Sequence, residues 1–151
     1  MVNTILDAVT KHLGNTFGNK YRYYVEDVQQ GFRTPAFVVG MITPMERSRN
    51  ARLYDRTMPL VIHYFSDSEN ELKKDCYSMA EKIIECLEYL PVDDSLLRGE
   101  RLNWQIAENV LEVFVTYKFM SIKDSNIEDS MDSYKHNIDV KMQVMEFRKD
   151  W

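Results

Sequence analysis

The chain has few of the residues that interrupt secondary structure or cross-link it. Its 151 residues include five glycines, four prolines and two cysteines. So little glycine and proline argues against a long flexible linker and favours one domain with a real hydrophobic core. No apolar run approaches the roughly 20 residues of a membrane-spanning helix. Residues 1–14 carry no basic leader, so we expect no signal peptide and a cytoplasmic location.

The two cysteines cannot form a disulfide within one chain. Cys76 and Cys86 fall in one predicted helix, where ten residues separate their Cα atoms by about 15 Å. A disulfide requires a Cα separation below ~7 Å. We therefore expect Cys76 to be a small core hydrophobe. Cys86 lies off the centre of the helix's apolar stripe, and we expect it to be partly exposed.

An excess of positive charge is also missing. The formal net charge of −5 weighs against general binding to nucleic acid or to an anionic membrane. One local exception is residues 47–56, where four arginines occur close to Glu46 and Asp55. This segment is either a solvated loop or a loop that contacts an acidic partner or passing phosphates, and loops often carry function.

No catalytic motif is recognisable. The chain lacks the glycine-rich phosphate loops and the nucleophile elbow of hydrolases. His12, His63 and His136 are far apart and have no metal-ligand spacing, so we expect no catalytic residue, no metal and no cofactor. An enzyme built from scattered residues such as His63 and Glu26 is the least favoured class of function.

Residues 68–90 form the longest helical pattern. Ser68 and Glu71 match a capping box, and Pro91 is expected to end the helix. Spacings of three and four give one apolar stripe, made of Leu72, Cys76, Met79, Ala80, Ile83, Leu87 and Leu90. Glu81, Glu85 and Glu88 lie opposite this stripe, as a solvated face or a contact surface. The helix needs an apolar sheet beneath it.

The remaining periodicity predicts a first helix and that sheet. The helix spans residues 3–17, and the strands span residues 21–28, 36–42, 52–65, 102–107 and 110–120. Residues 43–50 are expected to be a loop and residues 91–97 a connection. Pro59 demotes the middle of its strand to an edge or a bulge. Glu108 and Asn109 are placed in a two-residue hairpin turn.

The composition changes after residue 122. Residues 123–133 are acidic, polar and without periodicity, which indicates a solvated spacer. Residues 137–144 then alternate apolar and polar side chains, as a strand does. We therefore divide the chain into a domain at 1–122 and an extension at 123–151. The strand at 137–144 returns to its own sheet or adds to that of a neighbour.

Five segments of the domain resemble a known family. They are residues 28–39, 54–65, 76–90, 96–102 and 108–119. Their motifs run in the order QGF-x-x-P-x-F, R-x-x-P-x-x-I-x-YF, AEK, LEYL and LRG. In this order and spacing the chain resembles the small tail terminator proteins of phages and prophages of Gram-positive bacteria.

The resemblance implies an α+β domain, with two helices packed on one face of a mixed or antiparallel sheet. The one further strand, in the C-terminal extension, is predicted from the alternation of residues 137–144 alone and not from the resemblance. The resemblance also implies a structural virion protein, assembled in the host cytoplasm, of which six copies form a ring at the head-proximal end of the tail. The ring would stop growth of the tail tube and dock the head-completion protein. DNA would only pass through its lumen, and no membrane would be involved.

On this reading the protein is not an enzyme and its functional residues lie at interfaces. The candidates are Gln30, Phe32 and Arg33 in a turn, and Arg47, Arg49, Arg52 and Arg56 in a loop. The alternatives are another neck or head–tail connector component of a phage, or a protein-interaction module outside phages.

Overall fold

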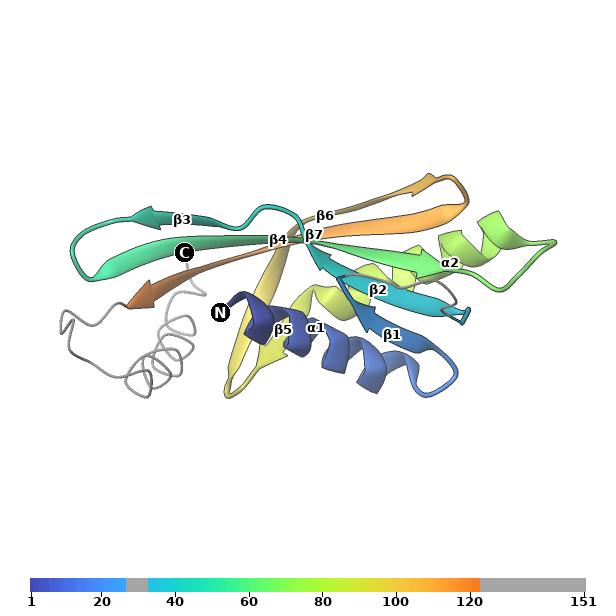
Figure 1. Cartoon of the computed structure of the whole chain (residues 1–151), viewed down its shortest axis with the longest axis horizontal. Coiled ribbons are helices and arrows are strands. Elements are labelled where there is room, and N and C mark those ends of the chain that lie inside the picture. Colours follow the sequence, from blue (N-terminus) through green and yellow to red (C-terminus); the bar gives the residue numbers. More distant parts are fainter. Residues whose placement is uncertain (27–32, 123–151) are drawn as a thin grey trace.

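The fold is α+β, as predicted, and both helices lie on one side of a seven-stranded sheet (Figure 1). The computed structural model describes residues 1–26 and 33–122. The elements are α1 (Val2–Phe17), β1 (Arg22–Val25), β2 (Ala36–Met41), β3 (Met45–Ser48), β4 (Leu53–Phe65), α2 (Leu72–Leu87), β5 (Tyr89–Val92), β6 (Ser95–Ala107) and β7 (Val110–Ile122). The predicted spacer and strand at 123–144 lie outside the described residues.

The sheet is mixed. Its order is β1-β2-β4-β7-β6-β5, and β3 pairs with β4 beside this path. Strands β1 and β2 are parallel, and the other pairs are antiparallel. Strands β4 and β7 form the centre of the sheet and share its longest ladder, which runs from Leu53–Ile122 to Tyr64–Leu111.

Alternation along the central strands builds the core. One face of β7 is buried, as the sequence predicted, and consists of Leu111, Val113, Val115, Tyr117 and Phe119. The same face of β4 supplies Met58, Leu60, Ile62 and Tyr64. These residues pack in one cluster with the apolar stripes of α1 and α2. A residue facing the other way on β4, such as His63, is only half-buried because no described helix covers that face.

Helix α2 is shorter than the predicted helix at 68–90. It ends at Leu87, and Leu90 lies in β5, still fully buried. The helix can end there because donors from other elements satisfy its last carbonyls. His12 Nε2 donates to Cys86 O at 2.8 Å, Tyr117 OH to Leu87 O at 2.7 Å, and Gly99 N to Glu88 O at 2.7 Å.

Both ends of the predicted helix are wrong. At the start, the helix begins at Leu72 with Glu71 as its N-cap and has no side-chain cap, so Ser68 does not cap it; its Oγ only accepts a hydrogen bond from the Glu71 N–H at 3.2 Å, ahead of the helix. At the end, Pro91 does not stop the helix, because it pairs with Leu96 inside β5. The predicted connection at 91–97 is therefore wrong: it contains the end of β5, a tight turn and the start of β6.

The prediction for Cys86 is also wrong. Its side chain is only 8% exposed, and its Sγ lies 3.2 Å from Thr16 Oγ1 of α1. Burial raises the pKa of the Cys86 thiol. The helical stripe is wider than the sequence pattern suggested, because α1 packs against the flank of α2 as well as the sheet against its centre. Cys76 is buried, as predicted.

Pro59 lies in a strand that is inside the sheet, not at its edge. Its neighbours explain how the ladder tolerates it. Strand β2 ends its pairing at Met41–Leu60, and β3 begins at Met45–Thr57. Pro59 falls in the gap between them, and its carbonyl accepts the Ile42 N–H at 2.9 Å. A proline, which has no N–H, is tolerated where no partner strand needs that donor.

Two further segments change identity. Residues 43–50, predicted as a loop, contain β3, which forms a hairpin with β4. Strand β6 begins at Ser95, seven residues before the predicted start at 102. A bulge between Glu100 and Asn103 bends it, with Arg101 at φ 53°. The Glu108–Asn109 turn is confirmed: φ is 52° and 64°, as a two-residue hairpin turn requires.

Candidate assembly surfaces

A hairpin arm projects from the sheet beyond both helices (Figure 1). We call it the arm: β3, the turn after it, the first five residues of β4 and the last five of β7, at 45–57 and 118–122. Strand β3 pairs only with β4 among the described strands, and all four of its residues are exposed. The arm holds all four arginines of the predicted loop, so the structure brings those candidates together.

Two of the four arginines are held by the arm itself. Arg49 Nε lies 2.7 Å from Asp55 Oδ2. Arg56 is the more buried, with its side chain 14% exposed, and it contacts Glu46 Oε1 at 3.2 Å and donates to Ser121 Oγ at 2.8 Å. These contacts tie β3, β4 and β7 together, so Arg56 is a structural residue of the arm.

Arg47 and Arg52 are different. Both are exposed, and no ion pair joins either of them in the part of the chain that the structure describes. Arg47 lies opposite Asp55, but Arg49 occupies that carboxylate. The backbone of Arg52 is held by its N–H, which donates to Asn50 Oδ1 at 2.8 Å. The arm therefore presents two positive side chains that have no ion pair among the described residues, Arg47 on β3 and Arg52 in the turn that follows it.

The predicted turn is separate from the arm. Gln30 and Phe32 lie outside the described residues. Arg33 is exposed, and its N–H donates to Tyr24 OH at 3.3 Å. It precedes β2, where Ala36 pairs with Phe65, ten residues along β4 from Asp55. At about 3.3 Å per residue this is roughly 33 Å, so the structure does not bring Arg33 to the arginines of the arm.

The residues weighed for an enzyme have structural partners instead. His63 Nδ1 lies 3.8 Å from Glu112 Oε2 on the neighbouring strand. The Glu26 carboxylate accepts the Met41 N–H at 3.1 Å and so caps the end of β2. Each side chain therefore contacts a neighbouring strand of the sheet.

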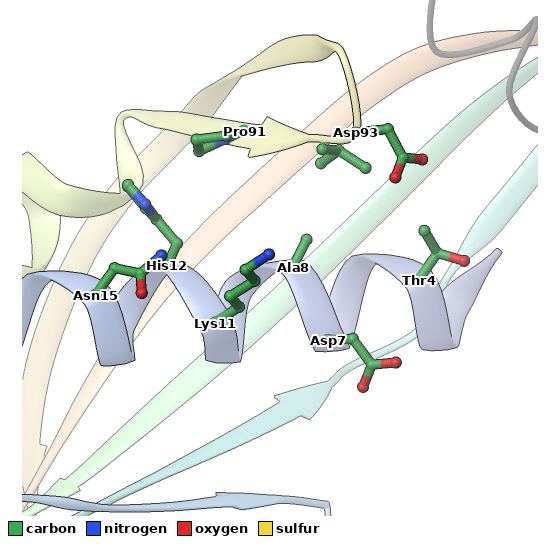
Figure 2. Close-up of a pocket in the computed structure, with 9 residues that line it drawn as sticks. Thr4, Asp7, Ala8, Lys11, His12, Asn15, Pro91 and Asp93 are labelled. Atoms are coloured by element: carbon green, nitrogen blue, oxygen red, sulfur yellow. The ribbon is translucent and has the colours of Figure 1, made fainter. Parts of the chain in front are cut away.

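An open groove of ≈ 480 Å³ lies between α1 and the turn after β5 (Figure 2). Its charged residues are Asp7, Lys11 and Asp93, which differ in sign. His12, at the end near α2, is engaged with the Cys86 carbonyl. Within residues 1–26 and 33–122 no three His, Cys, Asp or Glu side chains are arranged to hold a metal ion.

One exposed pair was missed by the sequence reasoning. Tyr77 of α2 and Trp104 of β6 are 50% and 38% exposed, and their ring centroids are 5.6 Å apart. A signal existed, because Trp104 stands between Asn103 and Gln105 in an alternating strand.

No helix in the described ranges is both long and apolar enough to span a bilayer.

Comparison with known proteins identifies the family. A family model described as "Phage tail terminator protein" matches residues 4–129, which is most of the chain. The search among curated proteins returns no match. One matching solved structure shares 9% identity, covering 82% of this chain and 96% of its own, with a TM-score of 0.41, too low to support an argument. The family model settles the assignment: the chain belongs to the phage tail terminator protein family.

Proposed function

We propose that this protein is the tail terminator of its phage: six copies form a ring on the head-proximal end of the tail tube. The ring stops addition of further tube protein and docks the head-completion protein, while DNA passes through the lumen. One observation carries the proposal, the family match over residues 4–129, which gives the chain a structural role in the phage tail.

The mechanism is geometric and needs no reacting group. A ring that copies the symmetry of the tube on one face and differs on the other removes the surface on which the next tube ring would assemble. Head-to-tail contact within a ring requires two different patches on each subunit. The chain offers two patches that are far apart. One is the arm, which contains the start of β4 and the end of β7, and the other is the exposed Tyr77–Trp104 pair, near the turn that joins β6 to β7.

We assign the arm a contact role in this assembly. Arg47 and Arg52 are exposed charges without an ion-pair partner in the described ranges, so a partner's carboxylates can pair with them without breaking an existing bond. Charged contacts of this kind steer association and select the partner more than they add affinity. The acidic chain as a whole suits a lumen that does not grip DNA.

The test is capping of purified tail tubes, scored by tube length under the electron microscope. We expect the wild-type protein to limit tube growth and to appear as a ring at one end. Reversal of both charges, Arg47→Glu with Arg52→Glu, should weaken capping on the order of tenfold, a modest interface effect. Lys11→Glu with Lys20→Glu is the matched control, because these lysines are exposed in or just after α1 and belong to neither candidate patch.

The possible results separate the alternatives. Full capping by the arginine variant would remove the arm from the interface and leave the ring in place. A protein that stays monomeric and never caps tubes would overturn the proposed function. Binding to the head-completion protein without tube capping would instead favour the alternative of a neck component.

A further inference from the structure

Strand β6 has an outer edge that the described strands leave unpaired. Strand β5 pairs only with the start of β6, from Ser95 to Arg98. Beyond the bulge, residues 103–107 pair with β7 on one side and with no described strand on the other. Such an edge is a template for an added strand.

The hairpin geometry shows which groups face outward. A two-residue turn makes Ala107 and Val110 a hydrogen-bonded pair, and such pairs alternate with non-hydrogen-bonded ones along the ladder. Gln105 and Asn103 therefore direct their backbone groups to β7. Trp104 and Ile106 direct their N–H and C=O groups to the open edge.

The side chains at this edge alternate in polarity. Trp104 lies opposite Val113 and Ile106 opposite Leu111, so both continue the buried face that the helices cover. On the other face Gln105 donates to Glu112 Oε1 at 3.0 Å. The edge therefore favours a strand that is apolar on the helix side and polar on the other.

Residues 137–144 have that pattern. Four apolar side chains, Ile138, Val140, Met142 and Val144, alternate with Asp139, Lys141 and Gln143. Added beside β6, the apolar set would extend the face of Trp104 toward Tyr77, which is half exposed. The polar set would lie beside Asn103 and Gln105.

The other open edges match this segment less well. Strand β3 is exposed on both faces, β5 contains Pro91 within its four residues, and β1 is four residues long. The β6 edge combines outward-facing backbone groups with a partly exposed aromatic pair, Tyr77 and Trp104, against which apolar side chains of an added strand can pack.

The length of the chain favours a second copy as the donor. Nine residues of β7 separate Ile122 from Val113, the partner of Trp104, which is about 30 Å at ~3.3 Å per residue. The 14 residues 123–136, if flexible, have a root-mean-square span of only about 20 Å. The spacer would have to be stretched along its own sheet to reach its own edge.

We propose that residues 137–144 of one copy add as a strand to the β6 edge of a second copy, and that this exchange links the subunits head to tail. The inference rests on the proposed self-assembly, and it names the surfaces that join. The exchange is heterologous, because the donated strand and the accepting edge are different parts of the chain. Such contacts form a ring when the rotation from one copy to the next closes, as the proposed six-copy ring requires.

Two full-length variants test the exchange. Val140→Asp with Met142→Asp spoils the apolar side of the donor, and Ile106→Pro removes an outward N–H from the acceptor. We expect each variant alone to associate at least about tenfold more weakly than wild type by analytical ultracentrifugation. A mixture of the two should give a one-to-one dimer, because each supplies the part that the other lacks.

One control changes the same position as the acceptor variant, and the other adds the same number of carboxylates as the donor variant. Ile106→Thr retains the N–H, and Asn137→Asp with Gln143→Asp adds two carboxylates on the polar side of the donor. Both should associate like wild type. Thermal melting establishes that Ile106→Pro is folded, and if it is not, Trp104→Asp replaces it as the acceptor variant.

Hydrogen exchange of the Trp104 and Ile106 amides distinguishes the outcomes. Protection that rises with protein concentration, and that Val140→Asp with Met142→Asp abolishes, supports exchange between copies. Protection independent of concentration means the segment pairs within its own chain and overturns the proposal. Rings that form equally well from both variants also overturn it, but leave the proposed tail terminator function intact.

Discussion

At the scale of single residues, the end of α2 is the most constrained place in the protein. Gly99 passes so close to it that a Cβ there would lie 2.7 Å from Leu87 O and 2.9 Å from Val115 Cγ2. The first of these atoms is backbone, in the last turn of α2, and cannot rotate away. Gly99 is therefore required for β6 to cross beneath the helix end.

Gly99→Ala should lower the free energy of unfolding by about 1–3 kcal/mol, the usual cost of overpacking a core. Urea unfolding measures this change. Gly40→Ala is the matched control in β2, because its added Cβ would meet Val61 Cγ1 at an ordinary 3.7 Å. Equal stability of the two variants would show that the helix end can move aside.

Tyr117 predicts how stability responds to alkaline pH. Burial, and then the nearby Cys86 thiol, raise the pKa of Tyr117 above its ordinary value of 10.0. The unfolded chain therefore loses this proton at a lower pH than the folded chain does. The stabilisation is fully present below pH 10 and is lost progressively as the pH rises above it, by up to about 1.4 kcal/mol per pH unit.

We expect Tyr117→Phe to reduce the alkaline slope of the unfolding free energy by about one proton. It should also cost about 1–3 kcal/mol at pH 7, because Leu87 O loses its buried donor. Tyr77→Phe, at a half-exposed position, is the control for both effects. An unchanged slope in Tyr117→Phe would mean that another group titrates there.

At the scale of elements, the β6–β7 hairpin uses a turn that Glu108 does not favour, whereas Asn109 accepts its conformation more readily. Glu108 and Asn109 are both left-handed, a conformation that costs most L-residues roughly 1–2 kcal/mol. The register along β7 must be stabilising enough to impose it. The hairpin therefore forms because its strands pair and pack, and in spite of Glu108.

The double substitution Glu108→Asn with Asn109→Gly gives the turn the Asn-Gly sequence that left-handed hairpin turns favour. It should raise the free energy of unfolding by about 1 kcal/mol. Chemical denaturation measures the gain, and Glu81→Gln on the exposed face of α2 serves as a neutral control. A lower stability would indicate that the added glycine gains more freedom in the unfolded chain than it relieves in the turn.

Segments with strong hydrophobic periodicity were predicted correctly from the sequence, whereas short segments without it were not. The alternation of residues 110–120 predicted the buried face of β7, and the helical spacing predicted α1. Strands β3 and β5 had no such pattern: β3 is exposed on both faces, and β5 contains a proline. Their pairing comes from β4 and β6, which lie elsewhere in the sequence.

At the scale of the whole molecule, the division of the chain into a domain at 1–122 and an extension at 123–151 remains a proposal. Limited proteolysis should cut first within residues 123–133, whose composition is acidic and polar. Mass spectrometry should then find a resistant fragment that ends near residue 122. A first cut inside the sheet would contradict the division.

The candidate surfaces were only partly predictable. The cluster of arginines was visible in the sequence, but not that Arg49 and Arg56 pair within the arm while Arg47 and Arg52 do not. The Tyr77–Trp104 pair joins α2 to β6 and depends on how the two elements pack. Contacts of this kind depend on tertiary packing, which one chain's periodicity does not encode.

The sequence by itself determined the period of each long element, the apolar faces, the hairpin turn and the resemblance to the tail terminator family, because these depend on neighbouring residues and on motif order. Only the tertiary structure decided where α2 ends, why Pro59 is tolerated inside the sheet, and which edge of β6 remains open. Each of these depends on donors or strands supplied from a distant part of the chain, such as Tyr117 for α2 and β2 with β3 for Pro59.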